Sequence, residues 1–190
     1  MLIREPDYQK QLFEMIGRDH WSMDILRHAR TLDLPDWAIG AGFIRAMVWD
    51  QLTGRERTQL DDIDVLYFDP NNLSTDREKQ FEHILRSLCP DIPWSVKNQA
   101  RMHIRNKNMP YRNTEDAMRY WLETPTAVAV RLESDNQLSL LAPYGLNDLF
   151  QMIIRPTPSG ELKRDQFEHR LSRKPWLKLW PEVSVVRDKP

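Results

Sequence analysis

The sequence predicts an α+β (mixed α/β) fold, in which a mixed β-sheet is flanked by helices. Segments with apolar residues at helical spacing alternate with short runs of β-branched and aromatic residues, and turn residues separate them. Near residue 130, two apolar runs are joined by the polar stretch ESDNQ, which predicts a hairpin. Helices and strands in this order give a mixed sheet with helices packed on it.

The first elements are two helices, a strand and a third helix. Residues 8–32 carry apolar side chains at helical spacing, and we expect Gly17 to separate two helices there. Pro35 marks a turn, after which WAIG begins a short strand. Helical spacing returns after Gly42 and runs to a left-handed stop near Gly54.

The remaining elements follow from the same signals. DIDVLYFD is a predicted strand that ends at the turn DPNN, a helix is expected from about Asp76 to Leu88, and WSVKNQ is a further strand. Thr114 is the expected N-cap of a helix that reaches about Leu122. The tail holds a short helix from Asn147, a loop at RPTPSG, a charged helix and KPWLKLWP.

Length and composition predict one domain. The 190 residues are enough for a substantial core, and 41% hydrophobic with 29% charged residues is typical of a globular chain. We expect a single unit over residues 1–190, with a helical preface (1–34), a core (35–150) and a C-terminal helical extension (151–190).

The charge balance limits the classes of partner. Twenty-seven basic and 28 acidic residues give a net charge of -1, which does not support specific nucleic-acid binding. The apolar run WAIGAGFIRAMVW is too short for a bilayer and contains Arg45, so no membrane partner is expected. The single cysteine, Cys89, and the charged N-terminus favour a cytoplasmic protein.

Two short patterns carry candidate chemistry. In Gly40-Ala41-Gly42, missing side chains let backbone N–H groups approach a phosphate at the start of a helix, although glycines at such turns also serve tight packing. Asp62 and Asp64 alternate along a predicted strand, so both carboxylates leave the same face. They are suited to Mg²⁺ (or Mn²⁺), although a solvated turn would also explain them.

Together these patterns resemble the polymerase-β-type nucleotidyltransferase superfamily. Its signature is a glycine pair that opens a helix, followed by D-x-D on the neighbouring strand. LPDWAIGAGFIRAMVWD, DDIDVLYFD, WSVKNQARMH, TPTAVAVRL, APYGLNDLF and KPWLKLWP are similar to small bacterial nucleotidyltransferase-family proteins. The resemblance implies the superfamily fold, makes Gly40 and Gly42 the phosphate-side glycines, and makes Asp62 and Asp64 the metal ligands and catalytic residues.

The sequence departs from that pattern at the third carboxylate, which the superfamily places on a later strand. WSVKNQ contains no acid, and its polar candidates are Lys97 and Asn98. An asparagine oxygen can coordinate magnesium but cannot accept the proton of a hydroxyl. Asp148 and Glu133 are the candidates for a base from elsewhere in the chain.

A basic segment offers further phosphate ligands. Residues 92–114 contain several basic side chains and no acid, a bias that attracts anions or simply forms a solvated face. Lys97 and Arg101 are the expected phosphate-binding residues within it. Arg45, one turn into the glycine-led helix, is a third candidate.

Two functions fit these residues. The first is a magnesium-dependent nucleotidyltransferase, which transfers a nucleoside monophosphate from a nucleoside triphosphate to an unknown acceptor. The alternative keeps the fold without the chemistry, as a catalytically inactive nucleotide-binding or interaction protein.

Overall fold

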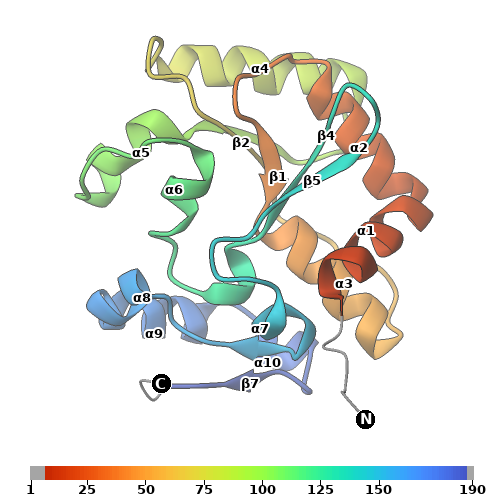
Figure 1. Ribbon diagram of the computed structural model, residues 1–190, viewed down its shortest axis with the longest axis vertical. Coiled ribbons are helices and arrows are strands. Elements are labelled where there is room, and N and C mark those ends of the chain that lie inside the picture. The colour runs from red at the N-terminus through yellow and green to blue at the C-terminus, as the bar shows by residue number, and fades with distance from the viewer. Residues whose placement is uncertain (1–6, 188–190) are drawn as a thin grey trace.

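The computed structural model describes residues 7–187, and a five-stranded sheet lies at its centre (Figure 1). The strand order is β3-β2-β1-β4-β5, with β2 parallel to β3 and every other pair antiparallel. The mixed sheet confirms the predicted fold class. The strands are β1 (Ala38–Gly40), β2 (Ile63–Tyr67), β3 (Trp94–Asn98), β4 (Ala129–Leu132) and β5 (Leu138–Leu141).

Two N-terminal helices flank the sheet. They are α1 (Tyr8–Arg18) and α2 (His20–Arg30), and the break lies at Asp19. The prediction of a break at Gly17 was wrong, because Gly17 lies inside α1. Asp19 has an extended backbone, and its carboxylate accepts a 2.6 Å hydrogen bond from Ser22 Oγ in the first turn of α2.

Helix α3 (Gly42–Thr53) is largely buried. Residues 43–50 are all buried, as expected for a helix whose apolar residues go all the way round. The helix ends at Gly54, whose positive φ of 65° confirms the predicted left-handed stop.

The middle of the chain differs from the prediction in two places. Helix α4 (Thr75–Leu88) follows Ser74 as N-cap, but a helix α5 (Gln99–Asn106) that the sequence did not predict follows β3 directly. Helix α6 (Thr114–Met118) is shorter than expected. The prediction of Thr114 as its N-cap was wrong, because the N-cap is Asn113, whose side chain accepts a hydrogen bond from the backbone N–H of Asp116. A short 3₁₀ turn, η1 (Thr124–Thr126), leads into β4.

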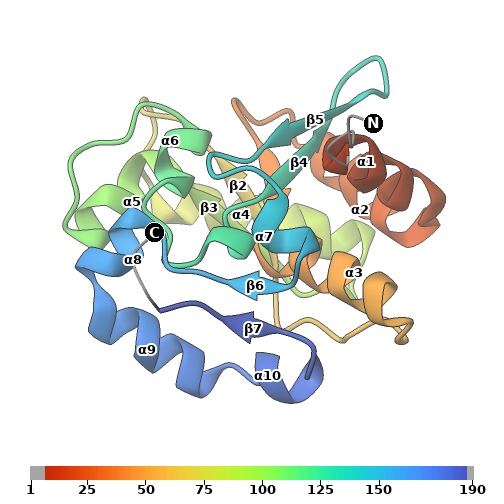
Figure 2. The same cartoon turned by 60° about the horizontal axis from the view of Figure 1, so that its bottom comes forward.

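The C-terminal segment combines short helices with a second sheet. Its elements are α7 (Asn147–Phe150), β6 (Ile153–Ile154), α8 (Pro158–Leu162), α9 (Arg164–Arg173), α10 (Trp176–Leu179) and β7 (Ser184–Val185). The pairing of β6 with β7 was not predicted. Figure 2 shows α9 and α10 beside this small sheet, at the opposite end of the molecule from α4 in Figure 1.

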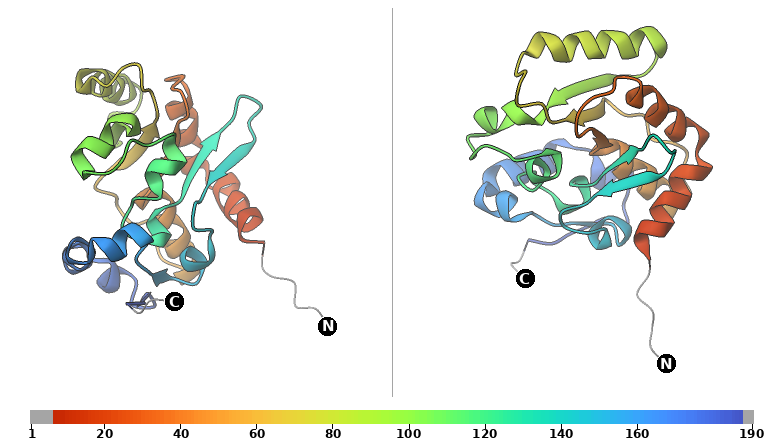
Figure 3. Two further views of the ribbon diagram at one scale, coloured as in Figure 1. Left: turned by 60° about the vertical axis from the view of Figure 1, so that its left-hand side comes forward. Right: turned by 45° about the horizontal axis from the view of Figure 1, so that its top comes forward.

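The two faces of the large sheet are covered differently. The main core includes Ile63 and Val65 of β2 and much of α3, whereas Leu66 belongs to a smaller cluster with Met118 of α6. Because side chains alternate along a strand, Asp62 and Asp64 share the face of Leu66. Figure 3 shows α5 and α6 on one side of the sheet.

Within residues 7–187, no helix combines the length and apolar character needed to cross a bilayer.

Candidate functional site

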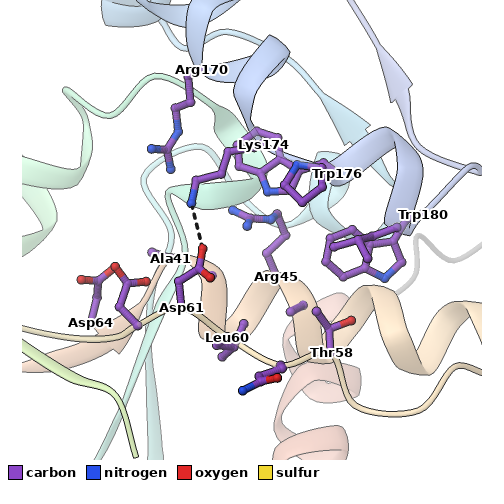
Figure 4. Close-up of a pocket in the computed structure, with 16 residues that line it drawn as sticks. Ala41, Arg45, Thr58, Leu60, Asp61, Asp64, Arg170, Lys174, Trp176 and Trp180 are labelled. Carbon is purple, nitrogen blue, oxygen red and sulfur yellow. Dashed lines mark hydrogen bonds and ion pairs between the residues drawn. The ribbon is translucent and has the colours of Figure 1, made fainter.

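The glycine turn and the aspartates lie side by side. In the antiparallel pairing of β1 with β2, Ile39 lies opposite Val65, and continuing this register places Gly40 beside Asp64. A cavity of about 210 Å³, here called the turn cavity, is lined by Ala41, Gly42 and both aspartates, Asp62 and Asp64 (Figure 4). The structure therefore brings the two predicted patterns together.

The two aspartates place negative charge at one side of the turn cavity. Burial first, and then the negative charge of Asp62, raise the pKa of Asp64 to about 6, while a hydrogen bond from Ser95 and the cations Lys97 and Arg170 act in the opposite direction. Two carboxylates that oppose each other's ionisation suit a divalent cation, which would neutralise both. Within residues 7–187, no three acidic, histidine or cysteine side chains form a ready-made metal cluster.

The two glycines have different surroundings. A Cβ on Gly40 would lie 2.8 Å from the Cβ of Ala129 and 2.9 Å from the carbonyl of Val128, so Gly40 is required for close packing against β4. A Cβ on Gly42 would meet no atom closer than 3.9 Å, and Gly42 lines the cavity at the start of α3. Between them, Ala41 has the unusual angles φ 55° and ψ -125°. Strain of this kind is typical of turns held for function.

Arg45 lies deep in the same cavity. It is 6% exposed, its Nη1 donates a 2.8 Å hydrogen bond to Thr126 Oγ1, and its guanidinium lies 4.3 Å from the ring centroid of Trp176. Burial lowers the pKa of Arg45 to about 10, and the carboxylate of Glu123 opposes this shift. Its side chain is therefore charged at neutral pH, and its Nε has no hydrogen-bond partner among the described residues.

Two basic residues, Arg170 of α9 and Lys174 at its C-cap, complete the cavity, and the sequence reasoning missed them. Figure 4 shows Arg170 and Lys174 reaching from the end of α9 toward the aspartates. Lys174 Nζ lies 3.5 Å from the exposed carboxylate of Asp61. Arg170 lies in the last turn of α9, and Lys174 is the extended C-cap residue that follows the helix. Nothing in the sequence linked these two cations to Asp62 and Asp64.

Glu123 is a buried acid that the sequence reasoning also missed. It is 2% exposed, and its Oε1 lies 2.9 Å from Arg170 Nε without the alignment of a hydrogen bond. Burial raises the pKa of Glu123, whereas Arg170 and Arg45 lower it. Glu123, Arg170 and Arg45 thus interact through their charges and link α3, the N-cap of η1 and α9.

The proposed phosphate ligands Lys97 and Arg101, and the candidate metal ligand Asn98, have structural partners. Lys97 Nζ donates to Glu82 at 2.8 Å, although Lys97 also lines a second cavity beside the aspartates. Arg101 donates to Glu78 at 2.7 and 2.5 Å and lines neither cavity. Asn98 is fully buried, and its amide bonds the backbone of residues 69, 72 and 100. In the parallel register Asn98 lies opposite Tyr67, three residues from Asp64.

The two candidate bases also lie elsewhere. Asp148 accepts from Thr124 Oγ1 at 2.6 Å and from Arg155 Nε at 3.0 Å. Glu133 follows β4 at the end remote from Ala129, the residue paired with Gly40, and accepts from Arg131 at 2.7 Å. Neither side chain lines a cavity with Asp62 and Asp64.

Solved structures share this architecture. One, described as an NMR structure that reveals a CCA-adding enzyme head domain, is 31% identical with a TM-score of 0.83, and the match covers 94% of this chain and 96% of that one. A CCA-adding enzyme with CTP (15% identity, TM-score 0.59) and the Thermotoga maritima CCA-adding enzyme complexed with tRNA (16%, 0.58) share the fold. The alignments cover 96% of this chain but only 44% and 43% of those larger chains.

A search of curated proteins gave no match. The sequence model of a nucleotidyltransferase family matches residues 27–185, which include every element from β1 to β7. The chain therefore belongs to this nucleotidyltransferase family.

Proposed function

We propose that this chain transfers a nucleoside monophosphate from a nucleoside triphosphate to an acceptor hydroxyl and releases pyrophosphate. The observation that carries the proposal is the turn cavity, where Asp62 and Asp64 face the start of α3 and the cations Arg170 and Lys174. A divalent metal and a polyphosphate are the partners that such a mixture of charges suits. The solved CCA-adding enzymes with CTP and with ATP support a triphosphate as the donor.

Each group has a distinct part in this reaction. Asp62 and Asp64 would hold Mg²⁺ or Mn²⁺, which supplies charge neutralisation at the phosphates when bound. The amides at Gly42, with Arg170 and Lys174, would hold the triphosphate in line with the acceptor. Buried Arg45 supports the positive side of the cavity.

The transfer exchanges one P–O bond for another. The acceptor oxygen bonds to the α-phosphorus, the bond to the bridging oxygen of pyrophosphate breaks, and the hydroxyl proton passes to solvent. Solvent is the proposed proton acceptor because neither candidate base, Asp148 or Glu133, lines a cavity with Asp62 and Asp64. The one cysteine, Cys89, is a free thiol, which fits a reducing cytoplasmic setting.

The test is pyrophosphate release from each of the four ribonucleoside triphosphates in magnesium, with cellular RNA and a small-molecule extract as acceptor sources. Release above a no-protein control, lost in Asp62→Asn and Asp64→Asn, is expected. If triphosphate binds but is recovered intact with both sources, the function is nucleotide binding without transfer.

A further inference from the structure

A second cavity adjoins the aspartates on the other side. It has a volume of about 450 Å³, shares Ala41, Asp62, Asp64 and Arg170 with the turn cavity, and is here called the sheet-face cavity. Its floor is the sheet, through Leu66 and the paired β3 residues, and its walls are α5, residues 120–123 and α9. Because both cavities meet at the aspartates, a group held in the second would face a triphosphate held in the first.

The cations of the sheet-face cavity suit a small number of phosphates. Lys97 is neutralised by Glu82 at 2.8 Å, and Arg170 pairs with Glu123 at 2.9 Å. Lys163 instead donates to the Asn106 carbonyl and the Asn108 side chain, at 3.2 and 3.0 Å. Arg105 is exposed and forms no ion pair or side-chain hydrogen bond with residues 7–187. Arg105 and Lys163 therefore have no carboxylate partner in the described part of the chain, and their two positive charges match one or two phosphate groups.

Aromatic rings in the same wall suit a flat ligand. Tyr120 and Trp121 are half-buried and line the cavity. The Tyr120 ring centroid lies 5.0 Å from that of Tyr111, so the ring is supported from behind. A supported aromatic side chain at a cavity wall can stack on a nucleobase. Gln99, Asn106 and Gln166 add polar groups that can hydrogen-bond base or ribose.

We propose that the sheet-face cavity is the acceptor site, and that it takes a terminal nucleotide with a phosphate and a free ribose hydroxyl. This inference rests on the proposed function, since the hydroxyl must reach the triphosphate across Asp62 and Asp64. The source of the nucleotide is a free mononucleotide or the end of an RNA, which present the same chemistry. A polycationic acceptor is disfavoured, because Arg105 and Lys163 would repel it.

The first test is binding without any triphosphate, so that it does not depend on transfer. AMP and a fluorescent five-nucleotide RNA are each titrated in magnesium against the wild-type chain and two matched variants. Arg105→Gln should weaken binding about tenfold, as expected for one lost charge-assisted contact. Lys107→Asn should bind as wild type, because Lys107 carries the same charge two residues away, outside the cavity, and asparagine tolerates its φ of 53°.

The second test uses the aromatic wall. Tyr120→Leu should weaken binding of the same probes severalfold, and Tyr120→Phe should retain it, since stacking needs the ring and not the hydroxyl. Tighter binding of AMP than of the RNA would identify the free nucleotide as the source, and the reverse would identify an RNA end.

Both tests have results that overturn the proposal. Equal affinity for Arg105→Gln and Lys107→Asn, or no binding of either probe to a chain that binds triphosphate, would remove the acceptor site while leaving the proposed function. Binding of AMP and RNA as predicted, with no transfer from any triphosphate, would instead retain the site and remove the proposed function.

Discussion

Gly40 and Gly42 differ in the space available for a Cβ atom: Gly40 has none, whereas Gly42 has room. Gly40→Ala would press a Cβ against the start of β4, at 2.9 Å from the carbonyl oxygen of Val128, and should destabilise the fold by about 1–3 kcal/mol or more. Gly42→Ala has room, so it should keep its melting temperature while binding triphosphate more weakly, because the methyl group enters the turn cavity.

Thermal melts and nucleotide titrations of these two variants separate packing from binding. A Gly42→Ala chain that binds triphosphate as tightly as wild type would contradict the placement of phosphate at this turn. A stable Gly40→Ala chain would show that β1 and β4 lie further apart than described.

Asp64 carries a stability cost in the absence of metal. Its pKa is raised from 3.8 to about 6, so the ionised form is disfavoured in the folded chain, and this destabilisation is present above pH 6 and disappears below about pH 4. Asp64→Asn should therefore stabilise the chain at pH 7.5 in EDTA by on the order of 1 kcal/mol.

Urea unfolding at pH 7.5 and at pH 4 measures this effect. The gain should shrink at pH 4, because folded Asp64 is then almost wholly protonated and the unfolded side chain, with a pKa of 3.8, is also partly protonated. Asp61→Asn is the matched control, because Asp61 is exposed and its substitution should change stability little at either pH.

The same residues show what a sequence can and cannot reveal about a site. Asp62 and Asp64 were predictable because the two-residue period of a strand places both on one face. Arg170 and Glu123 were not, because their proximity to Asp64 depends on how α9 and η1 pack, which no local pattern encodes.

At the scale of elements, acids of α4 explain why two cations of the basic segment (residues 92–114) are already paired. Glu78 and Glu82, one helical turn apart, face β3 and pair with Arg101 and Lys97. Two cations of a stretch without acids, Lys97 and Arg101, are thus neutralised by acids from the preceding helix. Charge bias along a segment predicts a free positive surface only where no neighbouring element supplies the opposite charge.

The Glu82 contact makes stability depend on pH. Burial would raise the pKa of Glu82, but hydrogen bonds from Lys97 and from the Val96 amide outweigh it and lower the pKa. A lowered carboxylate pKa stabilises the fold above the unfolded value of 4.5, and the contribution is lost as pH falls below it. Glu82→Gln should cost about 1 kcal/mol at pH 7.

Denaturant unfolding between pH 3 and 7 checks this expectation. The difference between wild type and Glu82→Gln should be constant near neutrality and vanish at the acid end. Glu56→Gln, at an exposed position, should follow wild type throughout. A difference that persists at pH 3 would show that the substitution acts through packing and not through charge.

The C-cap residue of α9, Lys174, supplies a prediction about binding. Lys174 lines the turn cavity, and its side chain is 38% exposed, so Lys174→Ala should fold normally. The loss of one cation near the phosphates should weaken triphosphate binding about tenfold. Arg173→Ala removes an adjacent charge that does not line this cavity and should bind as wild type. Equal weakening by both variants would indicate a general charge effect.

At the scale of the whole molecule, the order of helices and strands was more predictable than the packing of the C-terminal segment against the site. The strands β1 to β5 follow from local runs of β-branched and apolar residues with turn signals between them. The C-terminal segment looked like a helical appendage, yet it forms a second sheet and places Trp176 over Arg45. Contacts between residues more than a hundred positions apart leave no periodic signal.

The central claim is that Asp62 and Asp64 hold a metal that binds triphosphate against the start of α3. The most direct measurement is calorimetric titration of the chain with each ribonucleoside triphosphate, in magnesium and in EDTA, beside the double variant Asp62→Asn/Asp64→Asn. The account predicts saturable binding in magnesium that disappears in EDTA and in the double variant. Binding of equal affinity in all three conditions would contradict it.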